Sequence, residues 1–365
     1  AADLRRRIEG PLSALDISLG LWTGERKEAY RGGFPAVVVL TPESLDSRLS
    51  RDPSSISGVR AIVLDEIHVL DGTPRGDQLR ILVSRFRRLS PCIQVVAASA
   101  TTADPEGVAG RYLSDAVIVQ DPGRNPIRSR IIEGDSSRDV AREVEAVLRS
   151  GARKLILFTN SRKSVERYAS ALGRVQALRD IVIAHHGSLS RKVRQSAERR
   201  LLSSPRAVCV ATMTLELGID VGDVDVVGLI APPPDVASLV QRAGRSGRRG
   251  RGPRLLCFAH DEGDVFRYRV MLDLAGSARL ASDPYCFRPS VLVQQAMSIL
   301  HQNEARWVSA PAIRSRLDPG LAGAWSEERV LRILEQMVEE EWLISGGRGR
   351  FVVGDRCERL WQRGL

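Results

Sequence analysis

The stretch Ile62-Val-Leu-Asp65-Glu66-Ile67-His68 begins with apolar residues, and two adjacent carboxylates follow them directly. A short apolar run of this kind, bounded by polar residues, predicts a buried β-strand at Ala61–Leu64. Similar runs lie at residues 36–40 and Gln94–Ala97, with a helical stretch at 76–88. Strands that alternate with helices in this way predict an α/β fold with a parallel sheet, and we expect its strands to be buried on both faces.

The two carboxylates follow the strand at the place where it meets the carboxyl edge of the sheet. Ligands of open α/β folds bind at that edge. A Walker B site fits the pattern: Asp65 would hold Mg²⁺, and Glu66 would orient and polarise the water that attacks a phosphoryl group. The alternative is an exposed strand end with two solvated acids.

A second series of strands and helices begins after a stretch at 121–139 that is rich in Pro, Gly, Asp and Ser. A helix at 138–149 precedes five predicted strands, at 154–158, 181–184, 207–211, 224–230 and 254–259. After about residue 262 the chain is mostly helical, and it ends in a predicted hairpin over 343–353. The best helix candidates there are 291–301, 310–317 and 327–341. Helices followed by such a hairpin suggest a winged-helix module.

Composition and charge narrow the class of protein. The 365 residues are 43% hydrophobic and 27% charged, which excludes a disordered or collagen-like chain. A net charge of +10 suggests a polyanionic partner, either nucleic acid or an anionic membrane surface. No apolar run approaches the roughly 18–20 residues of a membrane span, and the first residues do not resemble a signal peptide. The five cysteines are isolated, so we expect a cytoplasmic protein without a disulfide framework or a Cys-rich zinc site.

Two further motifs directly follow predicted strands. Ser99-Ala100-Thr101 places short hydroxyls where they can link one site to the next, although Ser and Thr also commonly cap helices. Thr212-Met-Thr-Leu-Glu-Leu-Gly218-Ile-Asp220 follows a strand of the second series. Its Gly218 allows close approach of the backbone, and its Asp220 can receive a ribose or a basic group. The alternative for this second motif is a helix C-cap and a turn.

Gln241-Arg242-Ala-Gly244-Arg245-Ser-Gly247-Arg248 is more difficult to explain as structure alone. Six of the fourteen residues 241–254 are Arg and four are Gly. Crowded like charges are unfavourable unless an anion binds among them, and Arg stabilises charge on a transferring phosphoryl group. The alternative is a solvated charged loop.

In this order, D-E-I-H, S-A-T, L-E-L-G-I-D and Q-R-A-G-R-S-G-R resemble motifs II, III, V and VI of the superfamily 2 helicases. Thr41-Pro-Glu-Ser-Leu45 resembles motif Ib, Phe158-Thr-Asn160-Ser-Arg162 resembles motif IV, and His186-Gly-Ser188 resembles the loop that follows the next strand. The phrase over residues 215–225 is most similar to the Lhr ("large helicase-related") group, and the MrfA/YprA-like helicases are the nearest competitor.

The resemblance implies three domains: a partial RecA-like domain at 1–125, a second RecA-like domain at 126–265, and a winged-helix-like domain at 266–365. It implies an ATP-dependent helicase or translocase, with ATP and Mg²⁺ in the cleft between the RecA-like domains. Single-stranded or duplex nucleic acid is the implied partner, with DNA favoured over RNA and movement from 3′ to 5′.

The resemblance also implies roles for individual residues. The catalytic set is Asp65, Glu66, His68, Gln241, Arg245 and Arg248, with the last two as arginine fingers. The nucleotide and its metal are bound by Asp65, Glu66, Gly218, Asp220, Arg245 and Arg248, and Asp65 is the Mg²⁺ ligand. Ser99 and Thr101, together with His68, couple ATP hydrolysis to the binding of the nucleic-acid strand. The nucleic-acid contacts are Thr41, Pro42, Glu43, Asn160, Arg162 and Thr212.

One departure from the family matters. A Walker A loop, G-x-x-x-x-G-K-[ST], is absent, and the only Lys before Asp65 is Lys27, which has no Gly before it and no Ser or Thr after it. We therefore expect a fragment that lacks motif I and most of motif Ia, and that is inactive by itself. The alternatives are a non-catalytic nucleic-acid-binding scaffold with a degenerate core and a motor subunit of a repair or defence complex.

Overall fold

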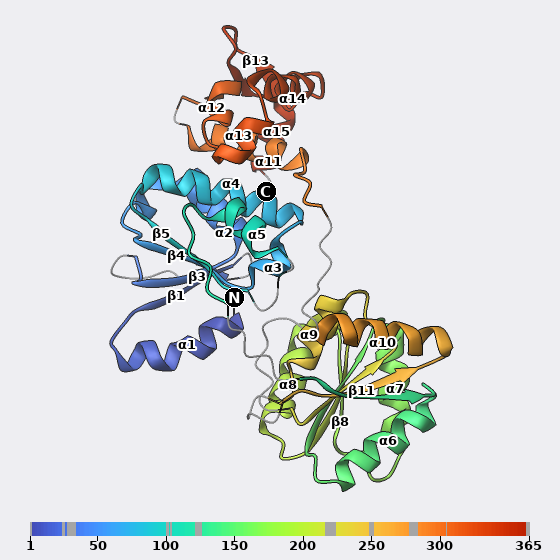
Figure 1. The fold of residues 1–365 in the computed structure, drawn as a ribbon. Helices are drawn as coiled ribbons and strands as arrows, with labels where there is room; N and C mark the ends of the chain where they lie inside the picture. Colours follow the sequence, from blue (N-terminus) through green and yellow to red (C-terminus); the bar gives the residue numbers. More distant parts are fainter. Residues whose placement is uncertain are drawn as a thin grey trace. The chain divides into compact units, whose positions relative to one another are not determined.

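The computed structural model describes residues 2–23, 26–27, 34–99, 102, 104–120, 126–215, 224–247, 252–276, 284–303 and 305–362. The chain divides into two compact units (Figure 1). Unit 1 comprises Ala1–Ala100, Asp104–Ile118 and Asp283–Leu365. Unit 2 comprises Thr101–Ala103 and Val119–Ser282. None of the helices in these described ranges has both the length and the apolar composition of a membrane-spanning segment.

Unit 2 is built on a six-stranded sheet in which every neighbouring pair is parallel. The strand order is β6-β11-β10-β7-β9-β8. The strands are β6 Arg128–Glu133, β7 Lys154–Thr159, β8 Val182–His185, β9 Ala207–Ala211, β10 Val226–Ile230 and β11 Arg254–Ala259. The prediction of an α/β fold with a parallel sheet is confirmed. The sequence does not reveal β6, because this strand begins with the exposed polar run Arg128-Ser129-Arg130 and lies at the edge of the sheet.

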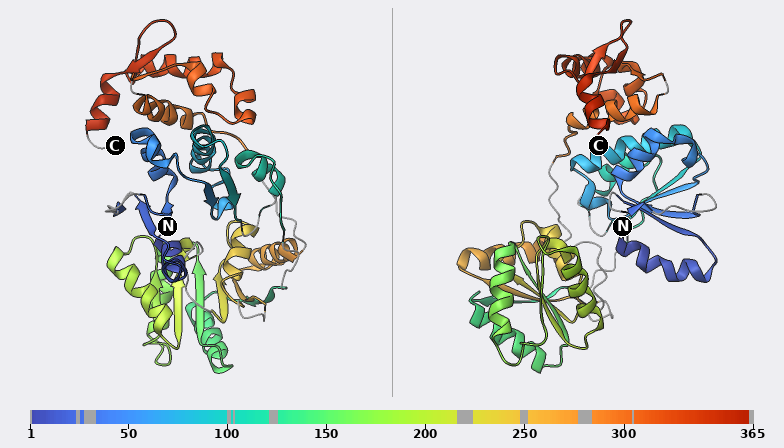
Figure 2. Two further views of the ribbon diagram at one scale, coloured as in Figure 1. Left: turned by 90° about the vertical axis from the view of Figure 1, so that its left-hand side faces the viewer. Right: turned by 180° about the vertical axis from the view of Figure 1, so that it is seen from behind.

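Helices cover both faces of this sheet (Figure 2). Alternate residues of β7 point to opposite faces, so Leu155 and Leu157 join one apolar core and Ile156 joins the other. The first core is completed by α6 Ser137–Arg149 and α7 Arg162–Gly173, and the second by α8 Arg191–Ser203, α9 Val236–Ala243 and α10 Glu262–Gly276. All five residues of β9 and of β10 are buried, as expected for central parallel strands.

The described strands of unit 1 form three small sheets, two of them within its first hundred residues and the third in its C-terminal part. β1 Leu19–Thr23 pairs in parallel with β3 Val37–Leu40 and antiparallel with β2 Arg26–Lys27. β4 Ala61–Leu64 pairs in parallel with β5 Gln94–Ala97. The strands predicted from the apolar runs are therefore present, with bounds within one residue of those expected.

The prediction that β4 and β5 are buried on both faces is wrong. Leu64 and its partner Ala97 face a core formed with α4 Pro74–Leu89 and α5 Pro105–Tyr112. On the other face, Val63 is 66% exposed and its register partner Val96 is 43% exposed. Successive residues of a strand point to opposite faces, and the two helices that build the core lie on one of them.

The N-terminal part of α4 passes close to neighbouring backbone. The helix begins after Thr73, whose side chain accepts a hydrogen bond from the Gly76 backbone N–H. A Cβ atom at Gly76 would lie 2.1 Å from the Leu70 carbonyl oxygen and 2.8 Å from the Tyr112 hydroxyl. Glycine is therefore required where this helix packs against α3 Ile67–Leu70 and α5.

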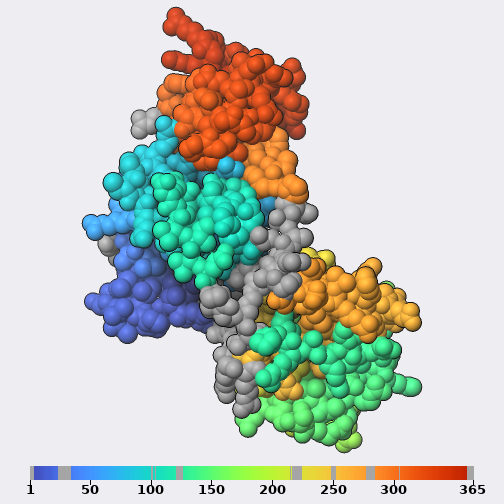
Figure 3. Space-filling view, in the orientation of Figure 1, coloured from blue at the N-terminus to red at the C-terminus, as the bar shows by residue number. Residues whose placement is uncertain are grey.

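The C-terminal residues form a helical module that packs on α4. Its apolar core includes Ile81 of α4 and Trp325, which is 8% exposed, and Trp342 is partly buried against it. The Trp361 side chain lies outside the described part. Figure 3 shows the atoms of this segment, in orange and red, seated on the rest of unit 1. Its elements are α11 Ser290–Gln302, β12 Trp307–Val308, α12 Ala310–Arg314, α13 Pro319–Ala324, α14 Glu327–Glu339, β13 Leu343–Ser345, β14 Phe351–Val353 and α15 Asp355–Gln362.

A buried polar cluster joins α2 Pro42–Arg51, α4 and α11. The guanidinium of Arg85 donates to Asp46 Oδ1 at 2.9 Å and to Gln295 Oε1 at 2.8 Å. Asp46 also accepts hydrogen bonds from Gln78 and Gln295, at 2.9 and 2.7 Å, and from Ser298. Asp46, Arg85 and Gln295 are 6%, 3% and 0% exposed, so the hydrogen bonds among them are buried.

A second set of polar contacts lies nearer the N-terminal end of α4. Arg80 forms a bidentate ion pair with Asp318, with both N···O distances at 2.7 Å. Asp77, which is fully buried, accepts hydrogen bonds from the Tyr285 hydroxyl at 2.6 Å and the Arg288 backbone N–H at 3.0 Å. Together with the Arg85 cluster, these contacts fix the C-terminal module to α4.

Candidate functional site

The predicted carboxylate pair lies at the carboxyl end of β4. Asp65 is exposed, and the Glu66 side chain is 41% exposed. The backbone of Glu66 has φ 51° and ψ 44°, in the left-handed region that non-glycine residues rarely adopt. Hydrogen bonds on both sides hold the turn, from Ala98 N–H to Leu64 O at 2.8 Å and from Ile67 N–H to Ala98 O at 3.0 Å. Such strain persists only where the surroundings impose it, and it is concentrated at functional sites.

His68 connects this turn to the segment after β5. A hydrogen bond joins His68 Nδ1 and Ser99 Oγ at 3.1 Å, and His68 Nε2 lies 3.5 Å from Glu66 Oε2. Burial lowers the pKa of His68 below its ordinary value, although the charges of Glu66 and Asp65 act to raise it. The imidazole is therefore neutral at pH 7, with one ring nitrogen able to donate and the other to accept.

The residues at this turn fit a magnesium ion bound with a phosphate ligand. Mg²⁺ usually takes one or two carboxylates from the protein and completes its shell with phosphate oxygens and water. Asp65 offers an exposed carboxylate of this kind. In the described residues, no group of three or more His, Cys, Asp or Glu side chains could enclose a metal by itself.

The residues of the predicted motif Ib open α2. Thr41 caps the helix, with its side chain accepting from the Ser44 backbone N–H at 3.4 Å, and Pro42 is the first helical residue. Glu43 pairs with Arg75 of α4, whose Nε and Nη2 atoms lie 2.6 and 3.2 Å from its carboxylate oxygens. Burial acts to raise the pKa of Glu43, but hydrogen bonds from Arg75, the backbone and Thr41 outweigh it and the pKa is lowered.

In unit 2, α9 carries the start of the arginine-rich motif. Gln241 is half-buried on the helix, and Arg245 follows its end and is also half-buried. Arg242 is 3% exposed; its Nη1 donates to Asn160 Oδ1 at 3.2 Å, and its guanidinium lies 5.4 Å from the centre of the Phe158 ring. Arg242 is thus the member of the motif that reaches motif IV, a role that sequence reasoning missed.

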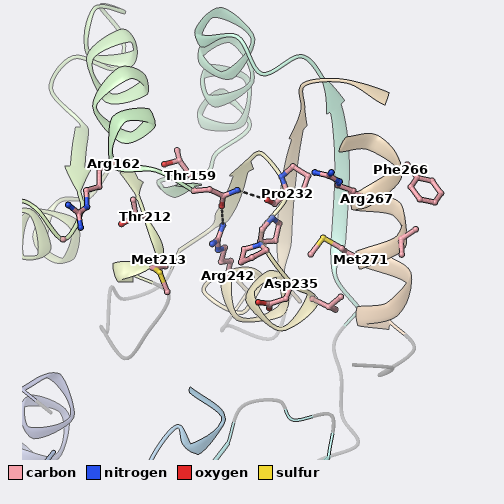
Figure 4. A pocket seen from close by; sticks show the side chains of 16 residues that line it. Thr159, Arg162, Thr212, Met213, Pro232, Asp235, Arg242, Phe266, Arg267 and Met271 are labelled. Carbon is pink, nitrogen blue, oxygen red and sulfur yellow. Dashed lines mark hydrogen bonds between the residues drawn. The ribbon is translucent and has the colours of Figure 1, made fainter. Parts of the chain in front are cut away.

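A pocket of about 870 Å³ lies at the carboxyl edge of the unit 2 sheet (Figure 4). Three of the predicted nucleic-acid contacts, Asn160, Arg162 and Thr212, line it together. The Asn160 amide donates to the Pro232 carbonyl oxygen at 2.8 Å while accepting from Arg242, so its side chain is held in place. The pocket also contains a wall that the sequence did not indicate, formed by Pro232, Pro233 and residues of α10.

The structure brings the predicted residues together in two places. Asp65, Glu66, His68 and Ser99 meet at one turn of unit 1, and Asn160, Arg162 and Thr212 meet at one pocket of unit 2. Four predicted site residues lie outside the described part of the chain: Thr101, Gly218, Asp220 and Arg248.

The histidine pair next to this pocket is engaged with carboxylates. His185 Nε2 lies 3.3 Å from Glu198 Oε1, and His186 Nε2 lies 2.6 Å from Glu166 Oε1. Both histidines are buried, at 2% and 5% exposed. Each imidazole is therefore held against a carboxylate of a neighbouring helix, α8 for His185 and α7 for His186.

The pKa values of two histidines of unit 2 are shifted in opposite directions from the ordinary value. Burial lowers the pKa of His185 although Glu198 acts to raise it, whereas a hydrogen bond from its imidazole to the Asp135 carboxylate raises the pKa of the exposed His260. The midpoint of His185 should therefore lie below 6.5 and that of His260 above it, in a titration of the imidazole protons followed by NMR. Because unfolding restores the ordinary pKa of His185, its contribution to stability is present above about pH 6.5 and declines as the pH falls. A His185 midpoint above 6.5 would contradict this burial effect.

Comparison with known proteins bears on both parts of the site. Residues 2–107 match the DEAD/DEAH box helicase family model, and residues 139–250 match that of the helicase conserved C-terminal domain. The ATP-dependent helicase Lhr-Core of Methanocaldococcus jannaschii is 31% identical over 242 residues, which are 62% of this chain and 28% of that protein. The chain spans less than a third of that relative's length.

Solved structures agree with this result. The structure of Mycobacterium smegmatis helicase Lhr bound to ssDNA and AMP-PNP aligns with a TM-score of 0.82 and 25% identity, covering 98% of this chain and 52% of that one. The DUF1998 helicase MrfA bound to DNA has the same fold, with a TM-score of 0.70 at 20% identity, covering 97% of this chain and 50% of its own. The chain therefore belongs to the DEAD/DEAH box helicases of superfamily 2, and within that superfamily it is similar to the Lhr helicases.

Proposed function

We propose that this chain is part of a motor that hydrolyses ATP to move along a single strand of DNA. The observation that carries the proposal is the hydrogen bond between His68 Nδ1 and Ser99 Oγ, with Glu66 on the other side of the same imidazole. A neutral histidine that contacts both a carboxylate and a hydroxyl can transmit a change in the position or charge of one group to the other. This is the connection that coupling of hydrolysis to strand movement needs.

The roles at the phosphate site follow from the turn after β4. Asp65 holds Mg²⁺, which neutralises charge on the phosphate oxygens when it is bound. Glu66 accepts a proton from the attacking water and orients it, since its strained backbone and its His68 contact hold the carboxylate in position. Arg245 and Arg248 stabilise charge on the transferring phosphoryl group, Gln241 belongs to the same motif, and Gly218 and Asp220 contact the nucleotide. Thr101 acts with Ser99.

We further propose that the fragment needs an additional segment to bind phosphate. Val63 and Val96 lie side by side on one face of β4 and β5 and are largely exposed, which is unfavourable for two apolar side chains in water. A segment that carries a G-K-[ST] loop and packs on this face would bury both valines. Adding the upstream coding residues to the chain and measuring ATP binding tests this, with protection of the β4 and β5 amides from hydrogen exchange as a second readout.

The three-domain division at 1–125, 126–265 and 266–365 remains our proposal. We also propose that the module after residue 284 is winged-helix-like. The antiparallel sheet β12-β14-β13 supports this second proposal, because a winged-helix module combines helices with such a hairpin. Movement from 3′ to 5′ rests on the resemblance to the Lhr group. Unwinding of duplexes with a single 3′ or 5′ overhang by the extended protein distinguishes the two directions.

Strand binding by the present chain tests the proposal in unit 2. Arg162→Ala should weaken binding of a single-stranded DNA oligonucleotide about fivefold at 0.1 M salt, because one lost phosphate contact changes the salt slope of a single strand by about 0.7. The measurement is the slope of log K against log salt concentration by fluorescence anisotropy. Arg179→Ala, an exposed arginine outside the pocket, is the matched control. Equal slopes for the two variants would contradict the role of Arg162.

A further inference from the structure

The pocket at the carboxyl edge of the unit 2 sheet extends to α10, a helix that none of the motifs includes. Phe266, Arg267, Val270 and Met271 line its far side. In Figure 4, Arg162 and Thr212 lie at one end and Arg267 and Phe266 at the other, with Pro232 and Arg242 between them. The pocket therefore continues from the motif residues to α10.

The charged side chains of this pocket favour an anion. Its lining contains three arginines, Arg162, Arg242 and Arg267, and a single acid, Asp235. Asp235 is already engaged as the N-cap of α9, accepting from the Ser238 backbone N–H at 2.7 Å. Arg267 keeps its guanidinium in solvent: its side chain is 71% exposed, and its nearest carboxylate oxygen, on Asp264, is 3.9 Å away. A pair at this distance and exposure contributes little and leaves Arg267 able to bind another anion.

The apolar side chains of the pocket suggest which kind of anion binds. Met213, Phe266 and Val270 are 59%, 67% and 40% exposed, although all three are apolar. Exposed apolar side chains that gather beside arginines are typical of surfaces that bind single strands, because bases pack on apolar or aromatic groups while cations hold the phosphates. Free phosphate would leave these side chains uncovered, and an apolar peptide would leave the arginines without partners.

We propose that α10 extends the strand-binding surface and that Arg267 binds a backbone phosphate of the same single strand that Arg162 and Thr212 hold. This inference rests on the proposed function and adds a contact outside the helicase motifs. Phe266 and Val270, on the neighbouring part of the helix, provide the apolar surface for a base. Since the contact with the strand is to phosphate, it is tolerant of sequence.

The experiment compares Arg267→Ala with Arg269→Ala in the 365-residue chain. Both arginines are exposed on α10, but Arg269 is two residues further along, about 200° around the helix, and does not line the pocket. Arg267→Ala should weaken binding of a long single strand about fivefold at 0.1 M salt and lower the salt slope by about 0.7. Arg269→Ala should change neither by as much.

Oligonucleotide length and a second variant sharpen the test. The effect of Arg267→Ala should disappear with the shortest strand that still responds to Arg162→Ala, because such a strand cannot reach α10. Phe266→Ala should weaken binding of the long strand with an unchanged salt slope, since the lost contact is uncharged. Thermal unfolding of each variant verifies that the fold is intact.

The outcomes separate this inference from the proposed function. If Arg162→Ala weakens binding while Arg267→Ala and Arg269→Ala behave alike, the α10 contact is overturned and the proposed function stands. If no variant changes strand binding, or if the chain binds no strand, both are overturned. A loss of affinity for Arg267→Ala that does not depend on salt or on strand length would also overturn the phosphate contact.

Discussion

Glu66→Gln is expected to stop ATP turnover and to leave ATP binding intact, in a protein that includes the phosphate-binding loop. Glutamine has the shape of glutamate but cannot accept the proton of the attacking water. Removal of a general base typically lowers the rate of the chemical step by about 10²–10⁴-fold. The measurements are steady-state hydrolysis at saturating single-stranded DNA and equilibrium binding of a fluorescent ATP analogue.

A matched control separates this effect from a general loss of negative charge. Glu106→Gln changes an exposed glutamate in the first turn of α5, in the same unit, and should leave turnover unchanged. Normal turnover of Glu66→Gln would contradict the assignment of Glu66. Hydrolysis by the 365-residue chain alone, if Glu66→Gln removes it, would show that a complete phosphate site exists within these residues and would contradict the fragment proposal. Strand binding with no hydrolysis, even by the extended protein, would favour the non-catalytic scaffold.

Arg85→Ala should be the most destabilising of the substitutions considered. Its loss leaves the carboxylate of Asp46 buried without its cation, with Gln78, Gln295 and Ser298 as the remaining partners. Breaking a buried pair from one side costs about 3–5 kcal/mol, since the remaining charge has neither water nor a counter-ion. The free energy of unfolding in urea measures this directly.

Two comparisons test the cause of that loss. Arg332→Ala removes an arginine from a solvent-exposed pair with Glu328 on α14, where both side chains are more than two-thirds exposed, and should cost about 1 kcal/mol or less. The double variant Asp46→Asn with Arg85→Gln removes both charges and should recover part of the stability lost in Arg85→Ala. Equal effects of Arg85→Ala and Arg332→Ala would contradict the importance of burial.

Sequence reasoning succeeded where the information is local. The carboxylates of β4 and the hydroxyl of Ser99 each follow a short apolar strand, and parallel strands bring their carboxyl ends to one edge, so their proximity could be predicted. Asn160 and Thr212 were assigned to nucleic-acid binding only through the resemblance of their motifs, and the structure places both in one pocket. Sequence reasoning failed for Val63 and Val96, because an apolar run shows that a strand is suited to burial and does not show what covers each face.

Contacts between distant residues could not be predicted in the same way. Asp46, Arg85 and Gln295 belong to three helices, and no periodicity or spacing connects an aspartate to a glutamine 249 residues away. Arg242 was missed for a related reason: its motif suggests a phosphate, but the structure buries it against Asn160 and Phe158. Arg267 and Phe266 carry no motif, and only the pocket that they line indicates them.

The polar cluster around Arg85 also has a consequence for how the protein is made. Gln295 lies 210 residues downstream of Arg85, and all of unit 2 is translated between them. At about 5–20 residues per second, a ribosome needs roughly 10–40 s to reach Gln295 after it has added Arg85. During this interval α2 and α4 lack the helix that covers them, and the nascent chain exposes the apolar side of α4 to solvent. Unit 1 is the first to be started and the last to be finished, so it is the part of the protein in which delayed synthesis should favour chaperone binding or aggregation.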